Sequence, residues 1–71
     1  MKNSIKVERA IKNITQEQLA QLVQVSRQTI NAIELGKYNP STTLALKMSQ
    51  VFGKGVNEIF QLEDTDWKEE K

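Results

Sequence analysis

Three side chains that can form paired hydrogen bonds lie close together in the sequence: Arg27, Gln28 and Asn31. Arginine can donate two hydrogen bonds to guanine O6 and N7, and a glutamine amide can bond adenine N6 and N7 together. Asn31 can add a third contact, and the small Ala32 can approach a thymine methyl group. This chemistry favours contacts with base edges in double-stranded DNA. The alternatives are an ordinary polar helix face and, for Arg27, a bond to a phosphate.

A second set of polar residues can hold phosphates and so position the molecule on a duplex. Gln16 opens an expected helix, whose free N–H groups and positive dipole end favour an anion. Tyr38 can equally pack over the core with only its hydroxyl group exposed. The candidate phosphate contacts are Gln16, Ser26, Thr29, Lys37, Tyr38, Asn39 and Thr42.

Catalytic chemistry has little support in the composition. The chain has no histidine and no cysteine, which removes the usual general base, the usual thiol nucleophile and the commonest metal ligands. Its three glycines have no Walker spacing, so they do not form a phosphate-cradling loop. We therefore expect no enzyme activity, no metal, no cofactor and no small-molecule ligand.

The stretch from Thr15 to Leu35 predicts two short helices joined by a tight bend, which together would position the base-contacting residues. The apolar residues that recur at helical spacing form two groups: Leu19, Leu22 and Val23, then Ile30 and Ile33. Thr15 and Gln18 have the form of a capping box, so the first helix is expected to begin near Gln16. Ser26 is the expected cap of the second helix.

Three further helices are predicted over residues 5–12, 42–52 and 56–61. Ser4 and Ser41 are their candidate caps. In the first of these helices Ile5 is expected to face inward together with Ile11 or Ile14, and Val7 is expected to take the inward place of Glu8. Gly36 falls where a left-handed residue would end the helix before it.

The chain resembles the Xre/Cro family of helix-turn-helix regulators from about Ile5 to Leu62, and it is most similar to the short stand-alone members. The residues that carry the resemblance are Gln16, 19–20, 25–30, 33–34, 36–41 and 58–60. The resemblance implies an all-α fold of five helices, with the helix-turn-helix formed by the second and third. One departure is Gln24, which stands where the family usually has the turn glycine.

The resemblance also implies roles for individual residues. Arg9 would form an ion pair with Glu34; charge alone only permits this pair, and the alternative is a solvated Arg9. Gln16 would contact a phosphate, and the loop around Lys37 and Asn39 would lie along the DNA backbone. Family members dimerise on nearly palindromic operators, because one module covers only a half-site. The surface expected for a homodimer consists of Ile59, Phe60, Leu62 and Trp67, with core packing as the alternative for Ile59 and Phe60.

The charge is divided unevenly along the chain. Residues 1–62 carry eight Lys and Arg against four Asp and Glu, a net charge of +4, whereas residues 63–71 carry two against five, a net charge of −3. We therefore expect one DNA-binding domain over residues 1–62, able to attract a polyanion, and a flexible acidic tail over residues 63–71. With no cysteine and no long apolar run, the protein is expected to be cytoplasmic and free of membrane segments.

These observations predict a sequence-specific DNA-binding regulator, most simply a repressor that occupies an operator as a homodimer. The alternative is a protein-interaction module, such as an antitoxin, that binds a partner protein through its C-terminal segment and Trp67.

Overall fold

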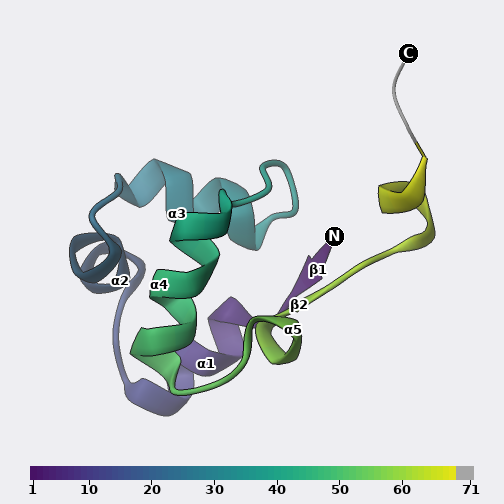
Figure 1. Ribbon diagram of the computed structural model, residues 1–71. Helices are drawn as coiled ribbons and strands as arrows, with labels where there is room; N and C mark the ends of the chain where they lie inside the picture. The colour runs from purple at the N-terminus through teal and green to yellow at the C-terminus, as the bar shows by residue number, and fades with distance from the viewer. Residues whose placement is uncertain (69–71) are drawn as a thin grey trace.

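The computed structural model describes residues 1–68 as a compact helical body with a short C-terminal arm (Figure 1). The described residues form five α-helices: α1 (Ile5–Lys12), α2 (Gln16–Val23), α3 (Arg27–Glu34), α4 (Thr42–Phe52) and α5 (Val56–Ile59). Two short strands, β1 (Lys2–Asn3) and β2 (Phe60–Gln61), pair in an antiparallel manner. The prediction of an all-α fold with a helix-turn-helix formed by α2 and α3 is confirmed.

The core lies between the helices, with α4 packed against α1, α2 and α5 (Figure 1). Apolar side chains from all five α-helices and from β2 meet there. The removal of their apolar surface from water is the main driving force for folding. The buried core residues are Ile5, Leu19, Ala20, Val23, Ile30, Ile33, Leu44, Ala45, Met48, Phe52, Ile59 and Phe60.

Side-chain caps begin three of the helices, as predicted. The Thr15 hydroxyl accepts a hydrogen bond from the Gln18 backbone N–H, and the Gln18 side chain accepts one from the Thr15 N–H, which completes the capping box. Ser26 and Ser41 cap α3 and α4 in the same manner, each through its hydroxyl oxygen. Ser4 is the N-cap residue of α1, as predicted, but its side chain makes no capping hydrogen bond. The Ile5 N–H donates instead to Asn3 Oδ1 at 3.2 Å.

Gln24 ends α2 in the left-handed conformation, with φ of 65° and ψ of 46°. The backbone bond from the Val25 N–H to the Ala20 carbonyl, 3.0 Å long, closes this turn. The Lys47 ammonium group donates to Gln24 Oε1 at 3.0 Å and so holds the side chain in place. The turn therefore keeps the geometry that glycine adopts more easily, without a glycine.

Glu8 is buried in α1, which overturns the expectation that Val7 faces inward. Val7 is exposed, and so is Ile11, whereas Glu8 is only 5% exposed. The Lys54 ammonium group donates to Glu8 Oε2 at 2.8 Å from the break between α4 and α5. This hydrogen bond raises the pKa of Lys54 above its ordinary value. A charged residue can occupy this position because its partner reaches it from outside the core.

The predicted helix over residues 56–61 is shorter in the structure, because Phe60 and Gln61 form β2. Asn3 pairs with Phe60 and Lys2 with Gln61, and the Ser4 N–H donates to the Ile59 carbonyl at 2.9 Å. Phe60 leaves the helix so that its ring can enter the core while its backbone pairs with β1. Ile59 and Phe60 are both buried, which is the core packing given above as the alternative to a dimer surface.

The C-terminal arm begins with a turn of 3₁₀ helix over Asp64–Trp67 (Figure 1). The Asp66 carboxylate accepts from the Glu63 backbone N–H at 2.7 Å, and this bond lowers the pKa of Asp66. The Met1 amino group lies 2.9 Å from Glu63 Oε1 and 3.1 Å from Asp66 Oδ2. Part of the predicted acidic tail therefore takes a defined turn. Residues 69–71 of that tail lie outside the described part of the chain, and the flexibility of residues 63–71 stays a prediction.

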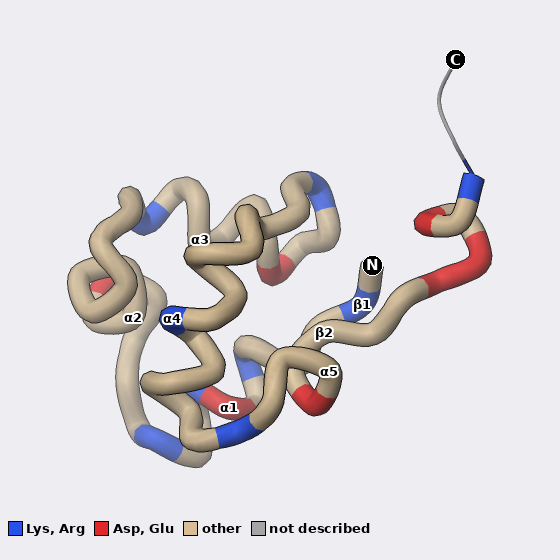
Figure 2. The backbone as a smooth tube through the Cα atoms, in the orientation of Figure 1, with Lys and Arg blue, Asp and Glu red and all other residues tan. Residues whose placement is uncertain are grey.

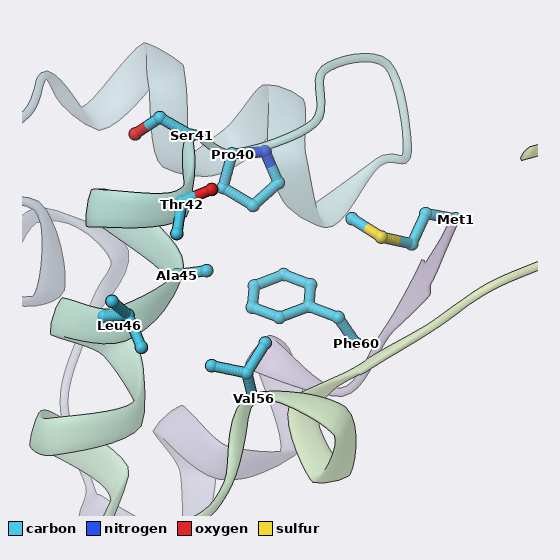
Figure 3. A pocket seen from close by; sticks show the side chains of 8 residues that line it. All are labelled: Met1, Pro40, Ser41, Thr42, Ala45, Leu46, Val56 and Phe60. Atoms are coloured by element: carbon cyan, nitrogen blue, oxygen red, sulfur yellow. The ribbon is translucent and has the colours of Figure 1, made fainter.

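A shallow apolar groove lies between α4, α5 and the start of the chain (Figure 3). The Phe60 ring and the Val56 side chain face Ala45 across it, and Met1 lies beyond the ring. Its lining consists of Met1, Pro40, Ser41, Thr42, Ala45, Leu46, Val56 and Phe60.

Candidate nucleic-acid interface

The outer face of α3 presents the three side chains singled out for base contacts. Arg27, Gln28 and Asn31 are exposed and together line one shallow depression. On the opposite face of the same helix, Ile30 and Ile33 are buried in the core. The amphipathic pattern of α3 therefore fixes which face points outward. In Figure 1, α3 runs across the molecule on the side away from α1 and α5.

A second shallow depression on α3 adjoins the first. It is lined by Gln28, Thr29, Ala32 and Tyr38. Ala32 and Thr29 are half-buried, and Tyr38 is exposed beside them instead of being covered by the core. The structure thus brings the tyrosine of the following loop next to the small Ala32 side chain.

Ser26 and Thr29 are already hydrogen-bonded at the start of α3. The Ser26 hydroxyl oxygen accepts from the Thr29 backbone N–H at 3.1 Å, and the two hydroxyl groups lie 2.9 Å apart. Because each hydroxyl has one hydrogen and two lone pairs, only one of the two hydroxyl hydrogens is needed for their mutual bond. One hydroxyl hydrogen of the pair therefore remains for an acceptor outside the protein.

Arg9 forms an ion pair with Glu34 that joins α1 to the end of α3. Arg9 Nε donates to Glu34 Oε2 at 2.7 Å and Nη2 donates to Oε1 at 3.2 Å, which makes the pair bidentate. Arg9 Nη1 also donates to the Ile14 carbonyl at 3.2 Å. The side chains of Arg9 and Glu34 are 15% and 8% exposed. The pair therefore holds α3 at a set angle to the helix that precedes the motif.

Gln16 makes contacts that sequence reasoning missed. Its Nε2 donates to Asn31 Oδ1 and to Glu34 Oε1, both at 3.1 Å. An amide NH₂ has two hydrogens, so these bonds engage both of them. The remaining Gln16 Oε1 is an acceptor, which a phosphate oxygen cannot use. A phosphate at this helix start would therefore be bound by backbone N–H groups of the first turn of α2. No local pattern joins Gln16 to Asn31, because the contact depends on how α2 and α3 cross.

Cationic residues lie at both ends of α3 (Figure 2). Arg27 lies in its first turn, and Lys37 lies in the loop that follows Gly36, which takes a φ of 77°. Lys37, Asn39 and Thr42 are all exposed. Figure 2 shows the described acidic residues of the C-terminal arm beyond β1 and β2, and Arg27 and Gln28 are exposed. The outer face of α3 is thus free to meet a polyanion.

Within residues 1–68, no cluster of three or more acidic, histidine or cysteine side chains is arranged to hold a metal ion. None of the helices in the same part of the chain has the length and apolar character needed to cross a membrane.

Comparisons with known proteins agree with this arrangement. The Helix-turn-helix family model matches residues 5–59, which include all five helices. An uncharacterized HTH-type transcriptional regulator of Methanocaldococcus jannaschii is 53% identical over 66 residues, which covers 93% of this chain and 100% of that protein. Another from Archaeoglobus fulgidus is 44% identical over the whole length of both chains. YgzD of Bacillus subtilis, also an uncharacterized HTH-type transcriptional regulator, is 45% identical over 90% of this chain and 97% of its own length. The chain therefore belongs to the Xre/Cro-like helix-turn-helix family of transcriptional regulators.

Proposed function

We propose that this protein binds double-stranded DNA at specific sequences, with α3 in the major groove, and represses transcription by occupying an operator. The observation that carries the proposal is the outward placement of Arg27, Gln28 and Asn31 on one face of α3, opposite its buried isoleucines. An α-helix fits the major groove, and residues in the first turn of the second motif helix reach base edges. Arg27 and Gln28 occupy that turn.

The proposed phosphate contacts surround these base contacts. The first turn of α2, which begins at Gln16, supplies backbone N–H groups, and Lys37 and Asn39 extend from the loop after α3. Tyr38 adds its hydroxyl group next to Ala32. Ser26, Thr29 and Thr42 offer hydroxyl groups at the starts of α3 and α4. Such contacts set the register of a protein on the duplex without reading its sequence.

We further propose that the protein binds its operator as a homodimer. A single module with few ionic contacts binds weakly at cellular salt, and two half-sites about 34–36 Å apart would add their contacts. With Ile59 and Phe60 withdrawn into the core, the exposed Leu62 and Trp67 remain as apolar residues for this surface. Sedimentation that gives only a monomer at micromolar concentration, with and without DNA, would contradict this part of the proposal.

The direct test is selection of bound sequences from random duplexes, followed by gel shifts with the selected site. The wild-type protein should enrich one nearly palindromic sequence. Variants Arg27→Ala and Gln28→Ala should lose preference at particular base pairs, whereas Lys6→Ala, an exposed change on α1, should bind as the wild type does. Equal binding by all four proteins would refute groove reading by α3.

The exposure of Trp67 favours a second candidate function. This side chain is 73% exposed beside the acidic residues of the arm, and a large exposed aromatic residue is a common anchor for a partner protein. In an antitoxin-like module, Trp67→Ala would abolish partner binding while Arg27→Ala and Gln28→Ala would not affect it. The DNA-binding proposal predicts the reverse dependence for operator binding.

A further inference from the structure

Four side chains form one continuous line of hydrogen bonds from α1 to the outer face of α3. Arg9 donates to Glu34, Glu34 accepts from Gln16, and Gln16 donates to Asn31 Oδ1. The first member of the line is a permanent donor, and the last lies in the depression shared with Arg27 and Gln28. The line therefore joins a fixed charge in the scaffold to a side chain at the proposed base-contacting surface.

The chemistry of this line decides the orientation of both amide groups. The carboxylate of Glu34 can only accept, so the Gln16 atom that contacts it must be the amide nitrogen. That nitrogen carries a second hydrogen, which points at Asn31, so the Asn31 atom that receives it must be the oxygen. The opposite orientation of either amide would set two donors or two acceptors against each other. Asn31 Oδ1 is therefore held toward α2.

We propose that Asn31 reads the major groove as a donor only, and that Gln16 is the positioning residue that imposes this choice. This inference rests on the proposed DNA-binding function. Within residues 1–68, Asn31 Nδ2 donates to no protein atom in the structure, and Asn31 is exposed, so its NH₂ group is available to a base. A bidentate bond to adenine needs Oδ1 and Nδ2 aimed together at one base edge. The bond from Gln16 fills one of the two acceptor positions of Oδ1 and orients that oxygen toward α2, which opposes the bidentate geometry.

A donor-only side chain has a defined preference among bases. Guanine offers two acceptors in the major groove, O6 and N7, and thymine offers O4. Cytosine offers a donor, N4–H₂, which would oppose the Asn31 NH₂ group. Adenine combines an acceptor with a donor and loses the bond that a free asparagine would make to its N6. The base facing Asn31 should therefore be guanine first, thymine next and cytosine last.

The test is selection from random duplexes with the full-length protein and variants at Asn31 and Gln16. Asn31→Ala identifies the position, because it should flatten the preference at one base pair of each half-site and leave the others unchanged. The wild-type protein should prefer guanine there. Gln16→Ala frees Oδ1, so adenine should gain roughly 5- to 150-fold relative to guanine at that position alone. Asn31→Asp keeps the bond from Gln16 and turns an acceptor outward, so it should change the preferred base to cytosine.

The outcomes separate the inference from the function beneath it. A wild-type preference for adenine or cytosine at the Asn31 position overturns the inference, and so does an unchanged preference in Gln16→Ala. If Asn31→Ala selects the same operator with the same preferences as the wild-type protein, the inference is also overturned, but the proposed DNA-binding function is not. If the wild-type protein enriches no sequence, both the inference and the proposed sequence-specific DNA binding are refuted. Side-chain amide NMR spectra of the free protein provide a check of the scaffold, because Gln16→Ala should shift the Asn31 NH₂ signals if the bond is present in solution.

Discussion

Glu34 is the residue on which the geometry of the proposed DNA-binding face depends most. Its carboxylate accepts hydrogen bonds from Arg9 and from Gln16, so it joins α1, α2 and α3 at one point. The Glu34 side chain is almost fully buried, and a charge in that environment is tolerated only while its partners remain. Removing a partner should therefore cost more than an exposed ion pair contributes.

Arg9→Ala should lower the free energy of unfolding by up to about 3–5 kcal/mol, because it leaves the Glu34 charge buried with Gln16 as its remaining side-chain donor. Urea denaturation measures the change. Arg9→Lys is the matched control, since it keeps the charge but cannot form the bidentate bond, and it should recover only part of the loss. If Arg9→Lys lost as much stability as Arg9→Ala, the bidentate geometry of arginine would account for all of the stabilisation and the charge for none of it.

The raised pKa of Lys54 predicts that the stability of the protein declines at alkaline pH. Its pKa in the folded protein is raised from 10.5, chiefly by the hydrogen bond to Glu8. A raised folded pKa means that the contribution to stability is complete below the unfolded value of 10.5 and is lost as the pH rises through the higher folded value. Thermal unfolding from neutral pH to well above 10.5 should show this decline. Glu8→Gln removes the cause, so the decline should become smaller in that variant. An identical alkaline profile for both proteins would argue against the ion pair.

Among the elements, the turn between α2 and α3 departs furthest from the expected local chemistry. Gln24 and Asn13 both take positive φ values, 65° and 58°, although neither is glycine. Asparagine tolerates the left-handed region better than glutamine does, because its short polar side chain can bond locally. The strain is therefore concentrated at Gln24, where the Lys47 bond offsets part of it.

Gln24→Gly should be more stable than Gln24→Ala by about 1 kcal/mol, as measured by urea denaturation. Both variants lose the bond from Lys47, so their difference isolates the backbone conformation. Asn13→Gly compared with Asn13→Ala should show a gain of the same sign, since the same region of φ is involved. Equal stability of the two Gln24 variants would mean that the turn relaxes out of the left-handed conformation when the side chain is shortened.

Considered as a whole molecule, the chain has few cations at its proposed DNA-binding face. Arg27 and Lys37 are the Lys and Arg residues among the proposed contacts, although residues 1–62 carry a net charge of +4. The remaining positive charge lies elsewhere on the body, where it attracts DNA at long range without contacting phosphates. The acidic arm lies beyond the strands and partly offsets that attraction (Figure 2).

The salt dependence of operator binding should therefore be modest. Two cations per protomer predict a slope of log K against log salt concentration of about −1.8 for a monomer and about −3.6 for a dimer. Lys37→Ala should reduce the steepness by about 0.9 per protomer, whereas Lys6→Ala on α1 should leave the slope unchanged. Fluorescence anisotropy with a labelled duplex at several salt concentrations measures both. A wild-type slope much steeper than −3.6 would show that further cations contact the backbone.

Local chemistry was sufficient to predict most of the elements. The capping box at Thr15 and Gln18, the caps at Ser26 and Ser41 and the left-handed Gly36 involve residues within a few positions of each other, so their signals are present in any short stretch. The outward placement of Arg27, Gln28 and Asn31 follows from the apolar spacing of Ile30 and Ile33 on the same helix. These features could be read from the order of the amino acids, because the interactions that produce them are local.

The remaining features arise where distant segments meet. Glu8 is buried because Lys54 reaches it across 46 positions, and Phe60 leaves its helix because Asn3 offers a strand partner. Gln16 reaches Asn31 only because α2 and α3 pack against each other. Each of these contacts depends on the packing of separate helices, and a pattern of single-helix periodicity contains no information about which outward-facing polar atoms will come within bonding distance.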